Sequence, residues 1–344
     1  MGKLGLIWGL IKVVAPVPVA KLAYAGRRRI VAGRLMDAKA QAVSDLVAKI
    51  RGVDVMPTLS QSRAQLDAMA AKFDLPCPAS VTRKDVTLEG AFGPRPARLY
   101  VPNGKDPEAP QPTLLYLHGG GWVQGSIASH DGLCGKLSEV SGLRIISYDY
   151  VLAPEHKFPD LNADVLAAYR SLLAGAFGVT GESLSLGGDS AGANLTAALL
   201  HDLQDAGEAL PKAQLLIYPS VDARLTSQSN QDLATQPLLP RARIDWFLEH
   251  YLPEGQDRLS PRLSPLFSPH LAGQPPAYVI GGGHDPLWDD ALAYANALEA
   301  AGVRVTRDLY LGQVHAFLSL RKVLPDGVKA TEKAGAWLRE VHAS

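Results

Sequence analysis

The sequence of 344 residues lacks three features that would point to particular classes of protein. Its 34 lysines and arginines equal its 34 aspartates and glutamates, so it has no excess of positive charge for binding nucleic acid. Its only two cysteines, Cys77 and Cys134, belong to no CxxC motif and lie at no metal-site spacing from a histidine. Internal repeats and low-complexity tracts are also absent. We therefore expect two free thiols, no nucleic-acid partner and a small-molecule or neutral substrate.

The sequence also lacks a long, uninterrupted apolar run. Residues 4–19 are strongly apolar, but Lys12, Pro16 and Pro18 interrupt them, and a spanning helix needs about 20 apolar residues. Lys12 also breaks the apolar core that a signal peptide would have. The segment predicts a helix that either packs on a cap or makes peripheral membrane contact beside the arginines at 27–29. We expect a cytoplasmic protein, with export or membrane-surface association as alternatives.

What is present is a regular alternation of strand and helix patterns. The predicted strands are Asp85–Leu88, Ala97–Val101, Leu114–Leu117, Arg144–Tyr148, Leu184–Leu186, Leu215–Tyr218, Ala277–Ile280 and Val305–Leu309, with a turn at Gly93–Pro96 between the first two. The predicted helices are Ala163–Leu173, Asn194–Leu203, Ala291–Ala300 and Thr331–Val341. This order is typical of an α/β protein with a mostly parallel central sheet flanked by helices. Ligands of such sheets bind beyond the carboxyl ends of the strands.

Two segments depart from this alternation. Residues 37–73 repeat apolar side chains at three- and four-residue spacing and predict N-terminal helices. Residues 220–270 form a long connection with one helical stretch around 244–251, and so long a connection is usually functional. We interpret both segments as parts of a helical cap over the strand ends. The predicted division is 1–75 for the N-terminal extension and cap helices, 76–221 and 270–344 for the two parts of the core, and 222–269 for the cap insertion.

The strongest local signal is the sequence Gly-Asp-Ser-Ala-Gly at residues 188–192, between a predicted strand and a predicted helix. A nucleophile at a strand-to-helix turn needs a sharp backbone bend. Glycines two positions before and after the serine remove side chains that would collide there. Ser190 is therefore the predicted nucleophile.

A serine nucleophile needs a base and an acid that orients the base. In this arrangement the partners follow in the order serine, acid, histidine, each after a later strand. Asp285 follows the predicted strand 277–280, and His315 follows the predicted strand 305–309. Asp289 and Asp290 are rival acids, but they lie where the next helix starts and are better explained as favourable charges at its amino end. The other eight histidines do not fit this order.

A second glycine motif, His118-Gly-Gly-Gly-Trp122, directly follows the predicted strand 114–117. Acyl transfer builds negative charge on the former carbonyl oxygen, and backbone N–H groups stabilise it. We predict an oxyanion hole formed by the N–H groups of Gly120, Gly121 and Ala191. A P-loop or dinucleotide-binding motif fits poorly, because no GK[ST] follows and no GxGxxG opens the first parallel unit. We also place Trp122 and Asp189 beside the substrate pocket, although Trp122 fits a core or lid contact equally well.

Together these motifs resemble those of the bacterial hormone-sensitive lipase family (family IV) of carboxylesterases, in the α/β-hydrolase superfamily. The HGGGW and GDSAG motifs match, as does the Asp-Pro-Leu sequence that begins at Asp285. Residues 150–159, YVLAPEHKFP, are similar to the family's YRLAPEHPFP, with Val151 in place of the usual arginine. The resemblance covers about residues 37–344.

The resemblance implies an α/β-hydrolase fold with a two-part helical cap, no metal and no cofactor. It also implies a serine carboxylesterase that hydrolyses short- to medium-chain esters through an acyl-enzyme, and it suggests a homodimer through an edge strand. An interfacial lipase or another acyl hydrolase is the alternative. A non-catalytic ligand-binding protein on the same scaffold is a further one, but such proteins typically lose the histidine, and this sequence has His315.

Overall fold

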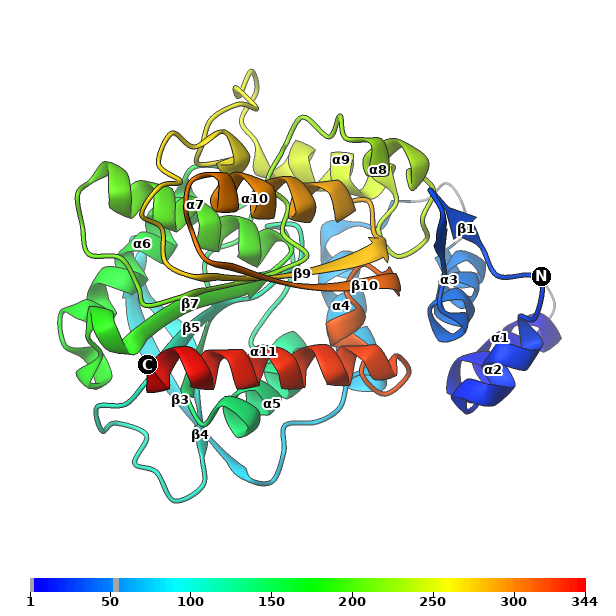
Figure 1. Ribbon diagram of the computed structural model, residues 1–344, viewed down its shortest axis with the longest axis horizontal. Coiled ribbons are helices and arrows are strands. Elements are labelled where there is room, and N and C mark those ends of the chain that lie inside the picture. Colours follow the sequence, from blue (N-terminus) through cyan, green and yellow to red (C-terminus); the bar gives the residue numbers. More distant parts are fainter. Residues whose placement is uncertain (1–2, 52–55) are drawn as a thin grey trace.

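In the computed structural model, which describes residues 3–51 and 56–344, eight strands form one sheet in the order β10-β9-β8-β7-β5-β6-β4-β3 (Figure 1). The strands are β3 (Val81–Gly90), β4 (Gly93–Pro102), β5 (Thr113–Leu117), β6 (Arg144–Tyr148), β7 (Leu184–Asp189), β8 (Gln214–Ile217), β9 (Ala277–His284) and β10 (Val305–Val314). Strands β5 to β10 run parallel, whereas β4 is antiparallel to β3 and β6. The prediction of a mostly parallel central sheet is confirmed.

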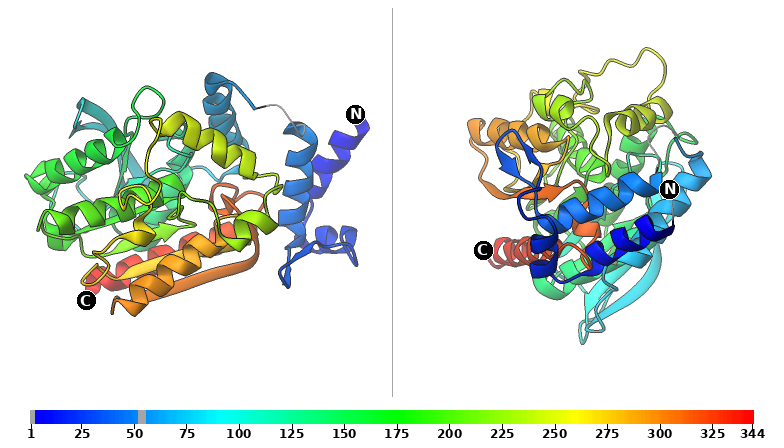
Figure 2. Two further views of the ribbon diagram at one scale, coloured as in Figure 1. Left: turned by 90° about the horizontal axis from the view of Figure 1, so that it is seen from above. Right: turned by 90° about the vertical axis from the view of Figure 1, so that its right-hand side faces the viewer.

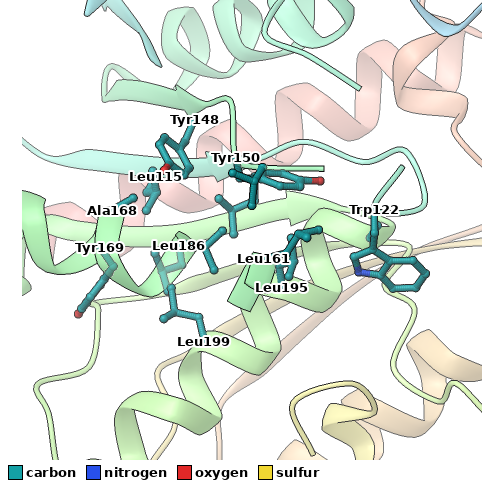
Figure 3. Close-up of a cluster of buried hydrophobic side chains, with 14 of the residues drawn as sticks. Leu115, Trp122, Tyr148, Tyr150, Leu161, Ala168, Tyr169, Leu186, Leu195 and Leu199 are labelled. Atoms are coloured by element: carbon teal, nitrogen blue, oxygen red, sulfur yellow. The ribbon is translucent and has the colours of Figure 1, made fainter. Parts of the chain in front are cut away.

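Helices cover both faces of this sheet. Two of them, α5 (Asp131–Ser141) and α11 (Pro325–Ala343), cover one face, and α6 (Asp160–Leu173), α7 (Ala191–Asp205) and α10 (Trp288–Ala300) cover the other (Figure 1). Side chains of a strand alternate between its faces. Tyr116 accordingly packs in the cluster with α5 and α11, while Leu115 packs with α6 and α7 (Figure 3). Burial on both faces explains why the inner strands β5 to β9 consist mainly of apolar residues and glycine.

The predicted strands and helices of the core are all present, with some differences at their ends. The predicted turn at Gly93–Pro96 is wrong, because β4 begins at Gly93 and the turn is formed by Ala91 and Phe92. Prolines 94 and 96 are tolerated in this strand because β6 pairs with β4 only from Ala97 onward. Helix α5 was not predicted. Cys77 and Cys134 are free thiols, as expected.

The remaining elements lie at the end of the molecule toward which the β9 and β10 arrowheads point (Figures 1 and 2). They are α1 (Lys3–Val14), α2 (Val17–Ala23), β1 (Ile30–Val31), β2 (Arg34–Leu35), α3 (Ala38–Arg51), α4 (Leu59–Phe73), α8 (Gln228–Asp232) and α9 (Arg241–Tyr251). Short 3₁₀ turns occur at 128–130, 176–178, 181–183, 265–267 and 317–319. The helices predicted within 37–73 and around 244–251 are confirmed, whereas the four-part domain division stays a prediction. Within the described ranges, no helix is both long and apolar enough to cross a membrane.

Candidate active site

Ser190 lies at the turn that joins β7 to α7, as the motif predicts. Its backbone has φ 53° and ψ −115°, a conformation that L-residues rarely adopt. The flanking glycines are required because the chain comes close to the end of β5. A Cβ atom on Gly192 would overlap the carbonyl oxygens of Leu117 and His118, and one on Gly188 would overlap that of Leu117. This strand-to-helix turn, the nucleophile elbow, therefore combines a strained serine with two positions that exclude any side chain.

Three side chains form a continuous relay at the carboxyl ends of the strands. His315 Nε2 lies 3.0 Å from Ser190 Oγ, and His315 Nδ1 lies 2.7 Å from Asp285 Oδ2. The second oxygen of Asp285 accepts a hydrogen bond of 2.9 Å from the N–H of Leu287. Because the carboxylate only accepts, it holds the proton on Nδ1 and leaves Nε2 free to accept the serine proton. Asp285 is completely buried.

The rival acids lie elsewhere. Asp289 accepts a hydrogen bond from the N–H of Ser229 at 2.7 Å, and Asp290 accepts from the N–H groups of Val221 and Asp222. Burial raises the pKa of Asp290 to about 8. These contacts hold both side chains at the start of α10 and away from the relay. With its pKa raised to about 8, Asp290 is mostly uncharged at neutral pH, so the predicted favourable charge at the helix start fits Asp289 only.

The second glycine motif forms a tight turn beside Ser190. Gly120 and Gly121 have φ of 131° and 61°, and the Gly120 carbonyl accepts hydrogen bonds from the N–H groups of Val123 and Gln124. Among the described residues no acceptor is found for the N–H of Gly120 or of Gly121. Both glycines line the same cavity as Ser190 and Ala191. The turn thus leaves backbone donors beside the nucleophile, where an oxyanion would need them.

Asp189 connects the two motifs. Its buried carboxylate accepts hydrogen bonds of 2.8 Å from the Gly119 N–H and from the Tyr116 hydroxyl, and it lies 3.1 Å from His130 Nε2. Burial by itself would raise the pKa of Asp189, but the charge of His130 and these hydrogen bonds outweigh it and hold the pKa below its usual value. Although Asp189 borders the cavity, its side chain is committed to positioning the glycine turn.

Trp122 also borders the cavity, but most of its ring is a core contact. It is 3% exposed, stacks on Tyr251 with ring centroids 4.9 Å apart, and donates from Nε1 to Asn194 Oδ1 at 3.3 Å. Of the two roles that the sequence left open, the contact with the cap helix α9 is therefore the larger one.

Comparisons with known proteins agree with this geometry. The family described as alpha/beta hydrolase fold matches residues 114–319. The carboxylic ester hydrolase LipN of Mycobacterium tuberculosis is 36% identical over 318 residues, which are 89% of this chain and 83% of LipN. The ethyl acetate hydrolase of Pseudomonas putida is 38% identical over 67% of this chain and 74% of its own. The chain belongs to the hormone-sensitive lipase family of carboxylesterases. It is a carboxylic ester hydrolase.

Solved structures are similar over nearly the same length. An alpha/beta hydrolase enzyme from the metagenome of Lake Arreo has a TM-score of 0.84 and 36% identity, covering 89% of this esterase and 98% of that chain. The hyperthermophilic esterase of the archaeon Pyrobaculum calidifontis has a TM-score of 0.78 and 33% identity, with the same coverage. The α/β-hydrolase fold predicted from the motifs is therefore confirmed.

The cavity of this esterase has a volume of about 630 Å³ and lies between the core and both cap segments. Ser190 and His315 border it, and it extends to Val13 of α1. Its lining is mainly apolar; the cap residues Val43, Leu46, Leu66, Met69, Ile244 and Phe247 contribute to it. Pockets of about 300–1,000 Å³ with such walls are typical of small-molecule sites.

A small polar group interrupts the apolar wall of the cavity. Arg243 of α9 donates to Ser62 and, at 3.3 Å, to Gln124 Oε1, and its guanidinium lies over the rings of Trp246 and Phe247 at 4.2 and 4.6 Å. These contacts join the N-terminal helix α4, the glycine turn and α9. Hydrogen bonds therefore connect the two cap segments and the glycine turn at the cavity wall.

Sequence reasoning missed the residues that support the relay and the turn. Tyr116 and His130 hold Asp189, and the N–H of Leu287 orients Asp285. His130 is one of the eight histidines that do not fit the order of the triad, and no motif singles it out. The one signal that could have revealed this support is the aspartate inside the GDSAG motif, because a buried carboxylate beside a nucleophile needs donors; nothing in the sequence says which residues supply them.

Proposed function

We propose that this esterase hydrolyses small carboxylic esters with short to medium acyl chains through an acyl-enzyme on Ser190. The single observation that carries the proposal is the unbroken relay Asp285–His315–Ser190, with hydrogen-bond distances of 2.7 and 3.0 Å, whose serine and histidine line an apolar cavity.

In the first half of the reaction, Ser190 Oγ attacks the ester carbonyl carbon while His315 Nε2 takes the serine proton. Asp285 keeps the imidazole in place and stabilises its positive charge. The carbonyl oxygen becomes negative and is stabilised by the N–H groups of Gly120, Gly121 and Ala191. His315 then gives the proton to the alcohol oxygen, the C–O bond breaks, and the alcohol leaves.

In the second half, a water molecule replaces the alcohol. His315 takes one of its protons as the water oxygen attacks the acyl carbon, and the same N–H groups stabilise the second oxyanion. The proton returns to Ser190 as the bond to the acyl group breaks, which releases the carboxylic acid and restores the enzyme. No group beyond those of the chain and water is needed to balance these steps.

The apolar walls and the cavity volume of about 630 Å³ support short to medium acyl chains. An interfacial lipase is the second candidate, because the cavity reaches the N-terminal helix α1 at Val13. A ligand-binding protein without activity is disfavoured by the intact relay. The cytoplasmic location and the homodimer remain predictions from the sequence.

The test is hydrolysis of 4-nitrophenyl esters from acetate to palmitate by the wild type and by Ser190→Ala. We expect the highest kcat/KM at short or medium chains and loss of turnover in the variant at every length. A maximum at the longest chains would favour the lipase instead. Turnover that persists in Ser190→Ala would overturn the proposed mechanism.

A further inference from the structure

The positive charge of this neutral chain is unevenly distributed. The first 36 residues contain seven of the 34 basic residues and none of the 34 acidic ones, so the rest of the chain has a net charge of −7. The same segment is the most apolar part of the sequence. A segment that is both apolar and basic differs from the acidic core that it covers.

Apart from Lys3 and Lys12, every residue of helix α1 is apolar. One side packs on α3: Gly9 and Val13 are buried, and Gly9 lies against Leu46. The other side carries Ile7, Trp8, Ile11 and Val14, which are 52%, 61%, 46% and 68% exposed. Residues 7, 11 and 14 form one stripe along a helix. The two roles that the sequence set as alternatives for residues 4–19 therefore fall on opposite sides of one helix.

Helix α2 also exposes apolar side chains. Val19 and Leu22 are 53% and 77% exposed, while Ala20 is buried. Both helices lie next to α3, at the right-hand edge of the molecule in Figure 1. We call Ile7, Trp8, Ile11, Val14, Val19 and Leu22 the N-terminal face. A helix that exposes apolar residues opposite its packed side needs a second apolar environment, and exposed apolar residues of this kind mark an interaction site.

The charges beside the N-terminal face distinguish between its potential occupants. Lys21 and Arg27 are exposed, and neither has an acidic partner among the described residues. In a two-fold dimer through this face, the same basic side chains would meet one another. An anionic bilayer instead attracts them, at about 1 kcal/mol for each basic residue near its surface. Charge complementarity therefore favours an anionic lipid surface over a second copy.

We propose that the N-terminal face docks this esterase on bilayers that contain anionic phospholipid, with Ile7, Trp8, Ile11 and Val14 entering the interface. Tryptophan is enriched at this depth of a membrane, and an interfacial helix binds through its apolar face together with basic residues. The acidic remainder of the chain faces away, because it is repelled by the same lipids.

The docked orientation has a consequence for the active site. Val13 lies on the inner side of α1 and lines the cavity that contains Ser190. The end of the cavity next to α1 and α3 is therefore the end nearest the bilayer. Esters dissolved in the membrane surface would reach the relay from this side.

The test is sedimentation of the full-length protein with vesicles of phosphatidylcholine alone or mixed with phosphatidylglycerol. We expect binding only to the mixed vesicles, and weaker binding at high salt. Ile11→Asp should lower the partition coefficient by roughly tenfold or more, and Lys21→Gln and Arg27→Gln by about fivefold each. The matched control is Leu259→Asp, since Leu259 is 48% exposed in the loop after α9 and lies outside the N-terminal face. This variant should bind vesicles as the wild type does.

Two further measurements keep the outcomes distinct. Turnover of 4-nitrophenyl acetate in solution shows that the variants at Ile11, Lys21, Arg27 and Leu259 are folded. Ser190→Ala, which has no turnover, should bind vesicles as the wild type does, so that loss of activity and loss of docking are separate results. Equal recovery on both kinds of vesicle, or unchanged binding of Ile11→Asp, would overturn the proposal. So would a dimer that Ile11→Asp dissociates while no form of the protein binds vesicles.

Discussion

Replacing Asp285 by asparagine tests the relay at its most specific point. The carboxylate accepts two hydrogen bonds, from His315 Nδ1 at 2.7 Å and from the Leu287 N–H at 2.9 Å. In Asp285→Asn the amide oxygen is the only acceptor and would face Leu287, so the amide NH₂ would face His315. Nδ1 must then accept a hydrogen bond, and the proton moves to Nε2. The histidine can no longer accept a proton from Ser190.

The expected loss in kcat is about 10⁴-fold, the size seen when a triad aspartate is changed in this way elsewhere. It corresponds to roughly 5.5 kcal/mol of transition-state stabilisation. Because the histidine still lies beside the ester and asparagine has nearly the same shape as aspartate, KM and the unfolding midpoint should change little. The loss should therefore fall on kcat alone.

The assay is the steady-state hydrolysis of 4-nitrophenyl butyrate by purified wild type, Asp285→Asn and Asp289→Asn. Asp289 is the matched control, because it lies four positions on and its carboxylate accepts from Ser229 rather than from His315. The variant Asp289→Asn should keep a kcat within a few-fold of the wild-type value. If Asp285→Asn keeps more than about a tenth of the activity, or if Asp289→Asn loses as much, the assignment of the acid is wrong.

Three further predictions concern stability. Gly192→Ala should lower the free energy of unfolding by about 3 kcal/mol and impair turnover, since its Cβ would overlap the Leu117 carbonyl oxygen; denaturant titration measures it. Burial holds the pKa of Asp290 at about 8, so the folded protein keeps a proton that the unfolded chain releases near pH 4. Stability from this group therefore falls as the pH rises from about 4 to 8, and Asp290→Asn should gain in thermal midpoint over the wild type across that range. Arg321 forms a buried pair with Asp74 at 2.6 and 2.8 Å, and Arg321→Ala should cost about 3–5 kcal/mol in denaturant titration.

Each of these predictions has an outcome that contradicts it. Gly181→Ala is the control for Gly192, since the nearest atom to its Cβ would be 3.9 Å away, and equal losses at both positions would refute the steric argument. A difference between Asp290→Asn and the wild type that does not change with pH would show that Asp290 is ionised when folded. A loss below about 1 kcal/mol for Arg321→Ala would mean that water reaches the Asp74 carboxylate.

Much of the core could be predicted because both faces of its sheet are covered. Strands buried on two sides must be short apolar runs, and β5 to β9 were found for that reason, whereas β10 lies at the edge of the sheet and is only partly buried. The relay residues could be predicted because each directly follows a parallel strand. The carboxyl ends of parallel strands lie at the same edge of the sheet, so these residues come together there. The turn at Gly93–Pro96 was predicted wrongly, since glycine and proline also occur in a strand where one neighbour is absent.

The sequence by itself determined the nucleophile elbow, the glycine turn and the order of the three relay residues, because backbone strain and strand order are local properties of the chain. Only the tertiary structure decided which donors hold Asp189, since Tyr116 and His130 lie 73 and 59 positions away from it. The tertiary structure also decided the shape of the cavity, and which side of α1 is buried and which is exposed. These depend on how the helices pack, and a helix with apolar residues on opposite sides does not show in its sequence which side will be covered.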